Sequence, residues 1–197
     1  MSYKNENMKM IELHENGLDI QFRIRENGVV ELADFSSQEV KKAVMEPKED
    51  ICYPAVEIHR SGTGSLNMHA YKNNINQSSV DFVYENHELK AQAGGKELEI
   101  VMISPEKLKA VYHMRLFDGV PAVQTWTEII NEGSEDQGLT YVSSFMYQGI
   151  SRGGEKPYYK KTDIYVPFNS WCCEAQWQKY DVETLNLNGM VVDGFNH

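Results

Sequence analysis

The chain has 197 residues and a net charge of −10, and 41% of its residues are hydrophobic. This composition excludes a largely disordered chain, and the acidic balance argues against binding to nucleic acid or to an anionic membrane. The length suits a single domain over residues 1–197. No apolar run has the length of a signal peptide or approaches the roughly 18 residues of a membrane-spanning helix, so we expect a cytoplasmic protein.

Apolar and polar residues alternate in the first part of the chain. Residues 20–24 and 30–35 each follow a period of two, which is typical of half-buried β-strands. Asn27 and Gly28 lie between the two runs and predict a hairpin, because both residues tolerate positive φ. The residues expected to face the core are Ile20, Phe22, Ile24, Val30 and Leu32.

One helix is expected, over residues 36–45. Ser36 and Glu39 have the spacing of a capping box, and residues 40–44 carry apolar side chains at helical spacing. Pro47 ends the run, since proline cannot continue a helix.

β-rich runs return in the middle of the chain. The expected strands are 96–103, 111–117, 121–130 and 139–147, and they are separated by turns at Gly94-Gly95 and Asp118-Gly119 and by a polar loop over 131–138. Short strands with turn residues between them and little helix predict an all-β fold, an antiparallel β-sandwich. The glycine-rich stretch 149–161 is the most loop-like part of the chain.

Two adjacent cysteines stand in the segment FNSWCCEAQW, residues 168–177. If this segment is one extended strand, Cys173 shares an apolar face with the tryptophans, whereas Cys172 lies on a polar face with Glu174. The thiols then diverge, which argues against a shared metal or a mutual disulfide. Cys173 is expected to be buried.

No motif in the chain singles out catalytic chemistry. The histidines lack metal-ligand spacing, and neither a nucleophile elbow nor a phosphate-binding glycine loop is present. We therefore expect no cofactor and no metal. The aromatic residues, among them Trp126, Trp171 and Trp177, suit either a packed core or stacking on sugar rings.

Several segments resemble, in order, the amino-terminal domain of bacterial α-galactosidases of glycoside hydrolase family 36. The most specific is residues 164–177, IYVPFNSWCCEAQW, which is similar to the family run LYVPHNSW-x-x-E-x-QW. Further blocks are YPAVEI (53–58), KELEIV (96–101), FDGVPAVQTWTEIINEGSE (117–135) and LTYVSSF (139–145). The resemblance covers most of residues 10–180.

The resemblance implies a β-supersandwich related in fold to galactose mutarotases. In the family a (β/α)8 barrel follows and supplies both catalytic aspartates of a retaining mechanism. It therefore implies that this chain holds no catalytic residue and is a truncated supersandwich, because the family's domain is longer. It also implies a homo-oligomer, and α-galactosides such as melibiose and raffinose as substrates of the intact enzyme.

The resemblance also implies candidate substrate-binding residues. In some family members a loop before the PAVEI strand reaches a neighbouring subunit's sugar pocket. Asp50 matches this loop, but Ile51 stands where an aromatic residue is expected and Cys52 where an arginine is expected. A thiol cannot make the bidentate contacts of a guanidinium group. Asp50, together with Trp171 and Glu174 of the segment 164–177, forms the candidate set.

Three functions stay open on the sequence alone. The first is an accessory domain of an α-galactosidase, and the second is a stand-alone carbohydrate-binding module. The third, by fold analogy, is a mutarotase-like activity that needs a general acid and a general base. Uncovered strand edges of a truncated sandwich also predict self-association.

Overall fold

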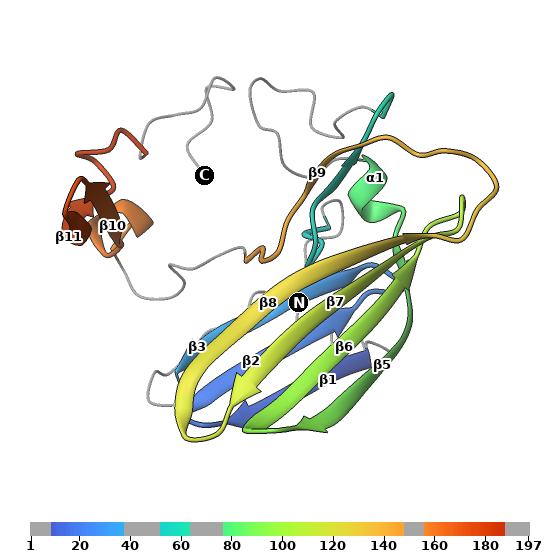
Figure 1. Cartoon of the computed structure of the whole chain (residues 1–197), viewed down its shortest axis with the longest axis horizontal. Helices are drawn as coiled ribbons and strands as arrows, with labels where there is room; N and C mark the ends of the chain where they lie inside the picture. Colours follow the sequence, from blue (N-terminus) through green and yellow to red (C-terminus); the bar gives the residue numbers. More distant parts are fainter. Residues whose placement is uncertain (1–8, 38–51, 64–76, 148–155, 188–197) are drawn as a thin grey trace. The chain divides into compact units, whose positions relative to one another are not determined.

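The computed structural model describes residues 9–37, 52–63, 77–147 and 156–187 (Figure 1). The described residues belong to two compact units: residues up to 147 form the first and residues 156–187 form the second. The chain is all-β and its strands pair in antiparallel fashion, as the sequence predicts. Among the described residues, no helix has the length and apolar character that crossing a membrane requires.

The first sheet of unit 1 contains the predicted hairpin. Strands β1 (Lys9–Glu15), β2 (Leu18–Ile24) and β3 (Val30–Ser37) pair in the order β1-β2-β3. Ile20 and Phe22 are fully buried, which confirms the predicted alternation. Gly28 takes a positive φ of 85°, whereas Asn27 instead accepts a hydrogen bond from the Val29 N–H at 3.2 Å. The sequence did not predict β1.

The second sheet of unit 1 is a four-stranded meander. Strands β5 (Val83–Gln92), β6 (Gly95–Ile103), β7 (Leu108–Phe117) and β8 (Val120–Asn131) pair in chain order. The predicted turns at Gly94-Gly95 and Asp118-Gly119 are confirmed. Both Gly94 and Gly119 have positive φ, which a residue without Cβ adopts most readily.

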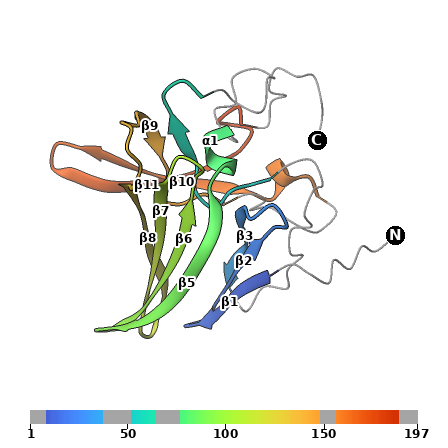
Figure 2. The same cartoon turned by 90° about the vertical axis from the view of Figure 1, so that its right-hand side faces the viewer.

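The three-stranded and the four-stranded sheets of unit 1 enclose the hydrophobic core (Figure 2). Phe22 of β2 meets Tyr112 of β7 edge to face, with ring centroids 5.7 Å apart. Because side chains alternate along each strand, each sheet turns one apolar face towards the other. Two sheets packed through such faces form a β-sandwich. Core residues include Ile20, Phe22, Leu32, Leu98, Ile100, Met102, Tyr112, Met114 and Leu116.

A short two-stranded sheet completes unit 1. It consists of β4 (Ile58–Arg60) and β9 (Leu139–Val142). Two serines of a one-turn helix, α1 (Gln77–Val80), form hydrogen bonds with the backbone of β4. The Ser79 hydroxyl accepts a hydrogen bond from the Ile58 N–H at 2.8 Å, and the Ser78 hydroxyl donates one to the Ile58 carbonyl at 2.7 Å. These contacts satisfy backbone groups of β4 that would otherwise be buried without a partner.

The prediction of a helix over residues 36–45 is wrong at its first two positions. Ser36 and Ser37 are the last residues of β3, and the Ser36 hydroxyl donates to the Asp34 carboxylate at 3.0 Å. Tertiary pairing with β2 therefore keeps Ser36 extended rather than capping a helix. Residues 38–45 lie outside the described part of the chain.

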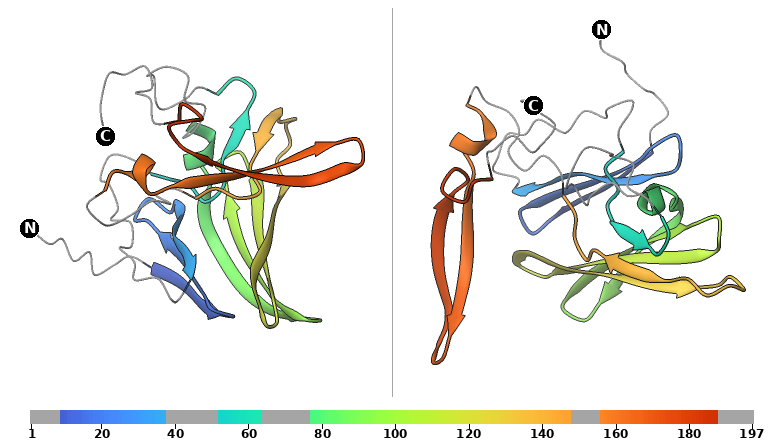
Figure 3. Two further views of the ribbon diagram at one scale, coloured as in Figure 1. Left: turned by 90° about the vertical axis from the view of Figure 1, so that its left-hand side faces the viewer. Right: turned by 90° about the horizontal axis from the view of Figure 1, so that it is seen from above.

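Unit 2 is a β-hairpin preceded by a single 3-10 turn. The turn is η1 (Tyr158–Lys160), and the hairpin consists of β10 (Asp163–Ser170) and β11 (Cys173–Asp181) (Figure 3). The chain reverses at Trp171 and Cys172, and Cys172 has a φ of 59°. A bulge follows, where Ala175 has a φ of 52° and its N–H donates to the Asn169 side-chain oxygen at 2.6 Å.

This reversal corrects the interpretation of residues 168–177 as one extended strand. A turn at Trp171 and Cys172 and a bulge at Ala175 interrupt the strand, so the alternation of faces does not run through the segment. Cys173 is exposed, not buried, and Cys172 is exposed as well. Both cysteines, together with Cys52, are free thiols.

Candidate functional site

The three predicted substrate-binding residues do not form an enclosed site among the described residues. Asp50 lies outside the described part of the chain. Trp171 is at the tip of the hairpin, where its side chain is 94% exposed, and Glu174 is exposed on β11. No structural contact tests their role, so it stays a prediction.

The hairpin does present aromatic rings to solvent. Trp177 pairs across the hairpin with Pro167, and Tyr165 pairs with Lys179. These registers place the Trp177 and Tyr165 side chains on the same face at diagonal positions, about 7–8 Å apart. They are 64% and 59% exposed, respectively, so both rings are accessible to a ligand.

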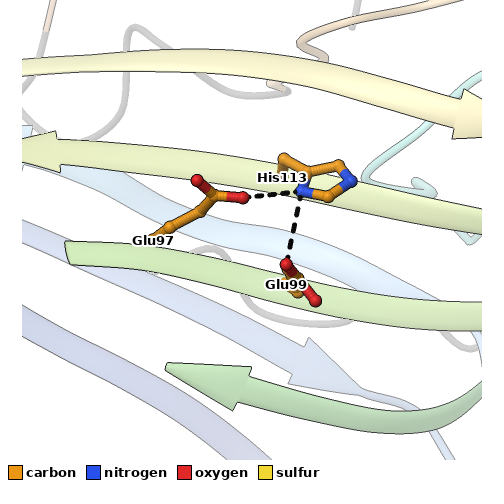
Figure 4. Close-up of side chains that lie close together, drawn as sticks. All are labelled: Glu97, Glu99 and His113. Carbon is orange, nitrogen blue, oxygen red and sulfur yellow. Dashed lines mark hydrogen bonds and ion pairs between the residues drawn. The ribbon is translucent and has the colours of Figure 1, made fainter. Parts of the chain in front are cut away.

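A second group of polar residues lies on the face of the four-stranded sheet opposite the core (Figure 4). Glu97 and Glu99 stand two residues apart on β6, and His113 stands opposite Glu99 on β7. His113 Nδ1 is 2.9 Å from Glu97 Oε1 and 3.9 Å from Glu99 Oε1. We refer to Glu97, Glu99 and His113 as the β6–β7 cluster.

Burial is the unexpected property of the β6–β7 cluster. The sequence places His113 on the polar face of its strand, yet the residue is only 8% exposed and Glu97 only 9%. Trp126 of β8 covers the imidazole, with the ring planes 6° from parallel and the centroids 4.6 Å apart. A carboxylate and an imidazole are thus paired in a largely buried position, where their interaction is stronger than in water.

The sequence did not predict this cluster, although it carried a usable signal. The signal is Glu-x-Glu on one expected strand and an outward-facing histidine on the next, because outward residues of paired strands become neighbours. As an acid and a base for sugar chemistry the pair is poorly arranged. Glu97 and His113 bond directly to each other, whereas an acid and a base must flank the sugar ring.

A buried glutamate fixes the segment that follows Asp50. Glu31 is fully buried, and its carboxylate lies 3.4 Å from Arg23 and 3.2 Å from Arg25. The same carboxylate accepts a hydrogen bond from the Tyr53 N–H at 2.8 Å, and Glu31 forms a bridge with Pro54. The start of the YPAVEI block is therefore attached to β3 by a buried carboxylate that also pairs with two arginines.

A second buried acid–histidine pair lies on and beside β4. His59 Nε2 is 2.9 Å from Glu57 Oε1, and the His59 ring packs at a tilt against Tyr141 with centroids 5.1 Å apart. The Glu57 N–H donates to the Ser143 hydroxyl at 2.8 Å. This pair lies within the sheet and is structural in character, because its hydrogen bonds connect β4 to the segment that follows β9.

The pKa of His87 is lower than its usual 6.5. Partial burial of the imidazole is the main cause, and the Lys9 ammonium group adds to it. Lys9 donates to the Tyr84 hydroxyl at 2.9 Å, and that hydroxyl lies 2.7 Å from His87 Nδ1. Lys9→Met should therefore raise the pKa of His87, as measured by NMR titration of the imidazole protons. Lys96→Met, which removes a lysine paired with Glu15, should leave the titration unchanged.

The lowered pKa of His87 also determines how the free energy of unfolding changes with pH. Below about pH 6.5 the unfolded chain binds a proton at His87 more readily than the folded chain does, so the free energy of unfolding falls as the pH drops. Lys9→Met should reduce that fall. A His87 titration curve identical in both proteins would contradict the contact.

Comparisons with known proteins place the fold. No family model and no curated protein matches the chain. The solved α-galactosidase from Lactobacillus brevis matches with a TM-score of 0.50 and 12% identity, over 91% of this chain and 28% of that chain. A glycoside hydrolase family 36 α-galactosidase from Geobacillus stearothermophilus, solved with raffinose, matches with a TM-score of 0.42 and 10% identity, over 64% of this chain and 22% of that chain.

This chain therefore spans less than a third of either solved protein. At 12% identity the likeness to the Lactobacillus brevis protein shows a shared fold. The resemblance that the sequence motifs suggest is confirmed at that level: the chain has a β-sandwich fold that is also found in part of an α-galactosidase.

Proposed function

We propose that this chain is the accessory amino-terminal β-sandwich of an α-galactosidase of glycoside hydrolase family 36. The observation that carries the proposal is the fold likeness to the Lactobacillus brevis α-galactosidase, which extends over 91% of this chain but only 28% of that enzyme. The ordered sequence blocks, from YPAVEI to the segment 164–177, support the same assignment.

In this role the domain is non-catalytic. It promotes oligomerisation and completes a substrate pocket for terminal α-galactosides, raffinose among them. The attachment of Tyr53 to Glu31 supports the second task, because it fixes the start of the YPAVEI block, the strand that follows the family's pocket loop. Free thiols at all three cysteines suit the reducing cytoplasm.

An activity assay tests the non-catalytic role. The purified 197-residue chain should not hydrolyse p-nitrophenyl α-galactoside at a rate above the buffer blank, while the intact Lactobacillus brevis α-galactosidase serves as the positive control. Clear turnover that persists through repeated purification would overturn the proposal that the chemistry lies in another domain.

Light scattering tests the oligomeric role. Exposed apolar residues, among them Leu139, Tyr141 and Phe145, favour association of this chain with itself. The weight-average mass should therefore exceed that of a single chain and rise with protein concentration. A constant monomeric mass across a hundredfold concentration range would contradict the proposed contribution to oligomerisation.

A carbohydrate-binding module is the second candidate, and the exposed Trp177–Tyr165 face favours it. Calorimetry with galactose, melibiose and raffinose distinguishes the two functions. A binding module should give a dissociation constant at or below about 1 mM, or roughly −4 kcal/mol, and Trp177→Ala should abolish it. Phe168→Ala, on the other face of the hairpin, is the matched control. Absence of heat with every sugar favours the accessory domain.

A further inference from the structure

The β6–β7 cluster has the donor set and the spacing of a metal site. It offers one imidazole nitrogen and two carboxylate oxygens, all within 4.8 Å of one another. Ligand atoms that are about 2.1 Å from a tetrahedral zinc ion lie about 3.4 Å apart. The distances from His113 Nδ1 to Glu97 Oε1 and Glu99 Oε1, 2.9 and 3.9 Å, bracket this value.

An independent observation concerns the other nitrogen of the same imidazole. His113 Nε2 is buried and has no hydrogen-bond partner among the described residues. It lies 3.8 Å from Glu128 Oε2 on β8. Buried polar atoms are almost always paired, so this atom requires an explanation. A metal on Nδ1 would leave the ring proton on Nε2, where it faces the Glu128 carboxylate.

We propose that Glu97, Glu99 and His113 bind a divalent transition metal, for which Zn²⁺ is the best-matched ion. Nitrogen together with carboxylate oxygen suits zinc, whereas Mg²⁺ and Ca²⁺ prefer oxygen ligands alone. Glu128 Oε2 lies 3.8 Å from Nε2, too far for a hydrogen bond, and would have to move closer to accept one from the Nε2–H group and orient the imidazole, an arrangement common behind metal-bound histidines. Three protein ligands leave one coordination position open.

The surroundings of the cluster are compatible with a bound cation. Lys90 contacts Glu99 through Oε2 at 2.5 Å, so Oε1 of the same carboxylate stays directed at His113. Trp126 stacks on the imidazole and shields that side of the cluster from water. The two glutamates carry a formal charge of −2, and the Lys90 ammonium group in contact with Glu99 offsets part of it, so a divalent ion would compensate what remains.

Calorimetric titration of the EDTA-treated chain with Zn²⁺ tests the proposal. The experiment uses the full 197-residue chain with Cys172→Ser and Cys173→Ser, because exposed thiols also bind zinc. One ion should bind per chain. His113→Gln and Glu99→Gln should each weaken binding by at least about tenfold, and Glu128→Gln, which keeps all three ligands, by about tenfold.

Controls separate a metal site from a structural cluster. His14→Gln removes an exposed histidine that is paired with Asp19 and should leave zinc affinity unchanged. Co²⁺ should give a visible absorption band that His113→Gln removes. If circular dichroism shows that His113→Gln does not fold, Glu99→Gln replaces it in the comparison, because the Glu99 side chain is 21% exposed. The proposal is overturned if the folded variants bind zinc as tightly as the parent chain. It is also overturned if the parent chain shows no binding at 100 μM Zn²⁺, a concentration that corresponds to a binding free energy of about −5.5 kcal/mol.

Discussion

Phe22→Ala should lower the free energy of unfolding by about 3–5 kcal/mol, the largest effect expected from a single side chain here. Phe22 is fully buried, and its ring meets Tyr112 across the two sheets of unit 1. Truncation removes the contact between the sheets and leaves a cavity, because the strands on both sides are held in register by their neighbours. Urea unfolding followed by circular dichroism measures the change.

A matched control for this substitution lies in unit 2. Phe168→Ala removes the same side chain from a position that is 46% exposed, and it should change the free energy of unfolding by less than about 1 kcal/mol. Equal effects of the two substitutions would show that the layer between the sheets does not hold the sandwich together.

Gly95→Ala should destabilise the chain by about 3 kcal/mol, the second large effect. A Cβ atom at this position would lie 1.9 Å from the Leu116 carbonyl oxygen and 2.9 Å from its carbonyl carbon. Both atoms belong to the backbone of the paired strand, so no side-chain rotation relieves the clash. Part of the β6–β7 pairing must open instead, which thermal or urea unfolding will reveal.

The neighbouring glycine provides the control for this prediction. Gly94 has a φ of 76°, but a Cβ atom added there would meet no described atom within 4 Å, so Gly94→Ala should cost only about 1 kcal/mol of backbone strain. Gly95 has a positive φ of 159° as well, so the difference between the two alanine variants measures the added cost of the close approach. A Gly95→Ala protein as stable as Gly94→Ala would contradict the close approach of β6 and β7.

The two kinds of site in this chain differ in how they are built. The β6–β7 cluster sits on a sheet whose other face is the core, so its geometry is rigid. Trp171 and Glu174 belong to a two-stranded hairpin, and both side chains are exposed on it.

Local chemistry was sufficient to predict much of the sandwich. The alternation at residues 20–24 and 98–102 was predicted correctly, because a strand at a core must place apolar residues at every second position. Gly94-Gly95 and Asp118-Gly119 were predicted as turns because glycine tolerates the φ values that tight reversals need. The order of the motif blocks suggested the fold that the comparison with the Lactobacillus brevis enzyme shows.

The fold class, the core faces and the glycine turns follow from the sequence, since each depends on neighbours along the chain. The tertiary structure sets which outward residues meet: strand register brought His113 beside Glu97 and Glu99, and Trp126 buried the imidazole. It also showed that the chain reverses at Trp171 and Cys172, where no glycine marks a turn. Contacts across strands depend on register and packing, which no local pattern specifies.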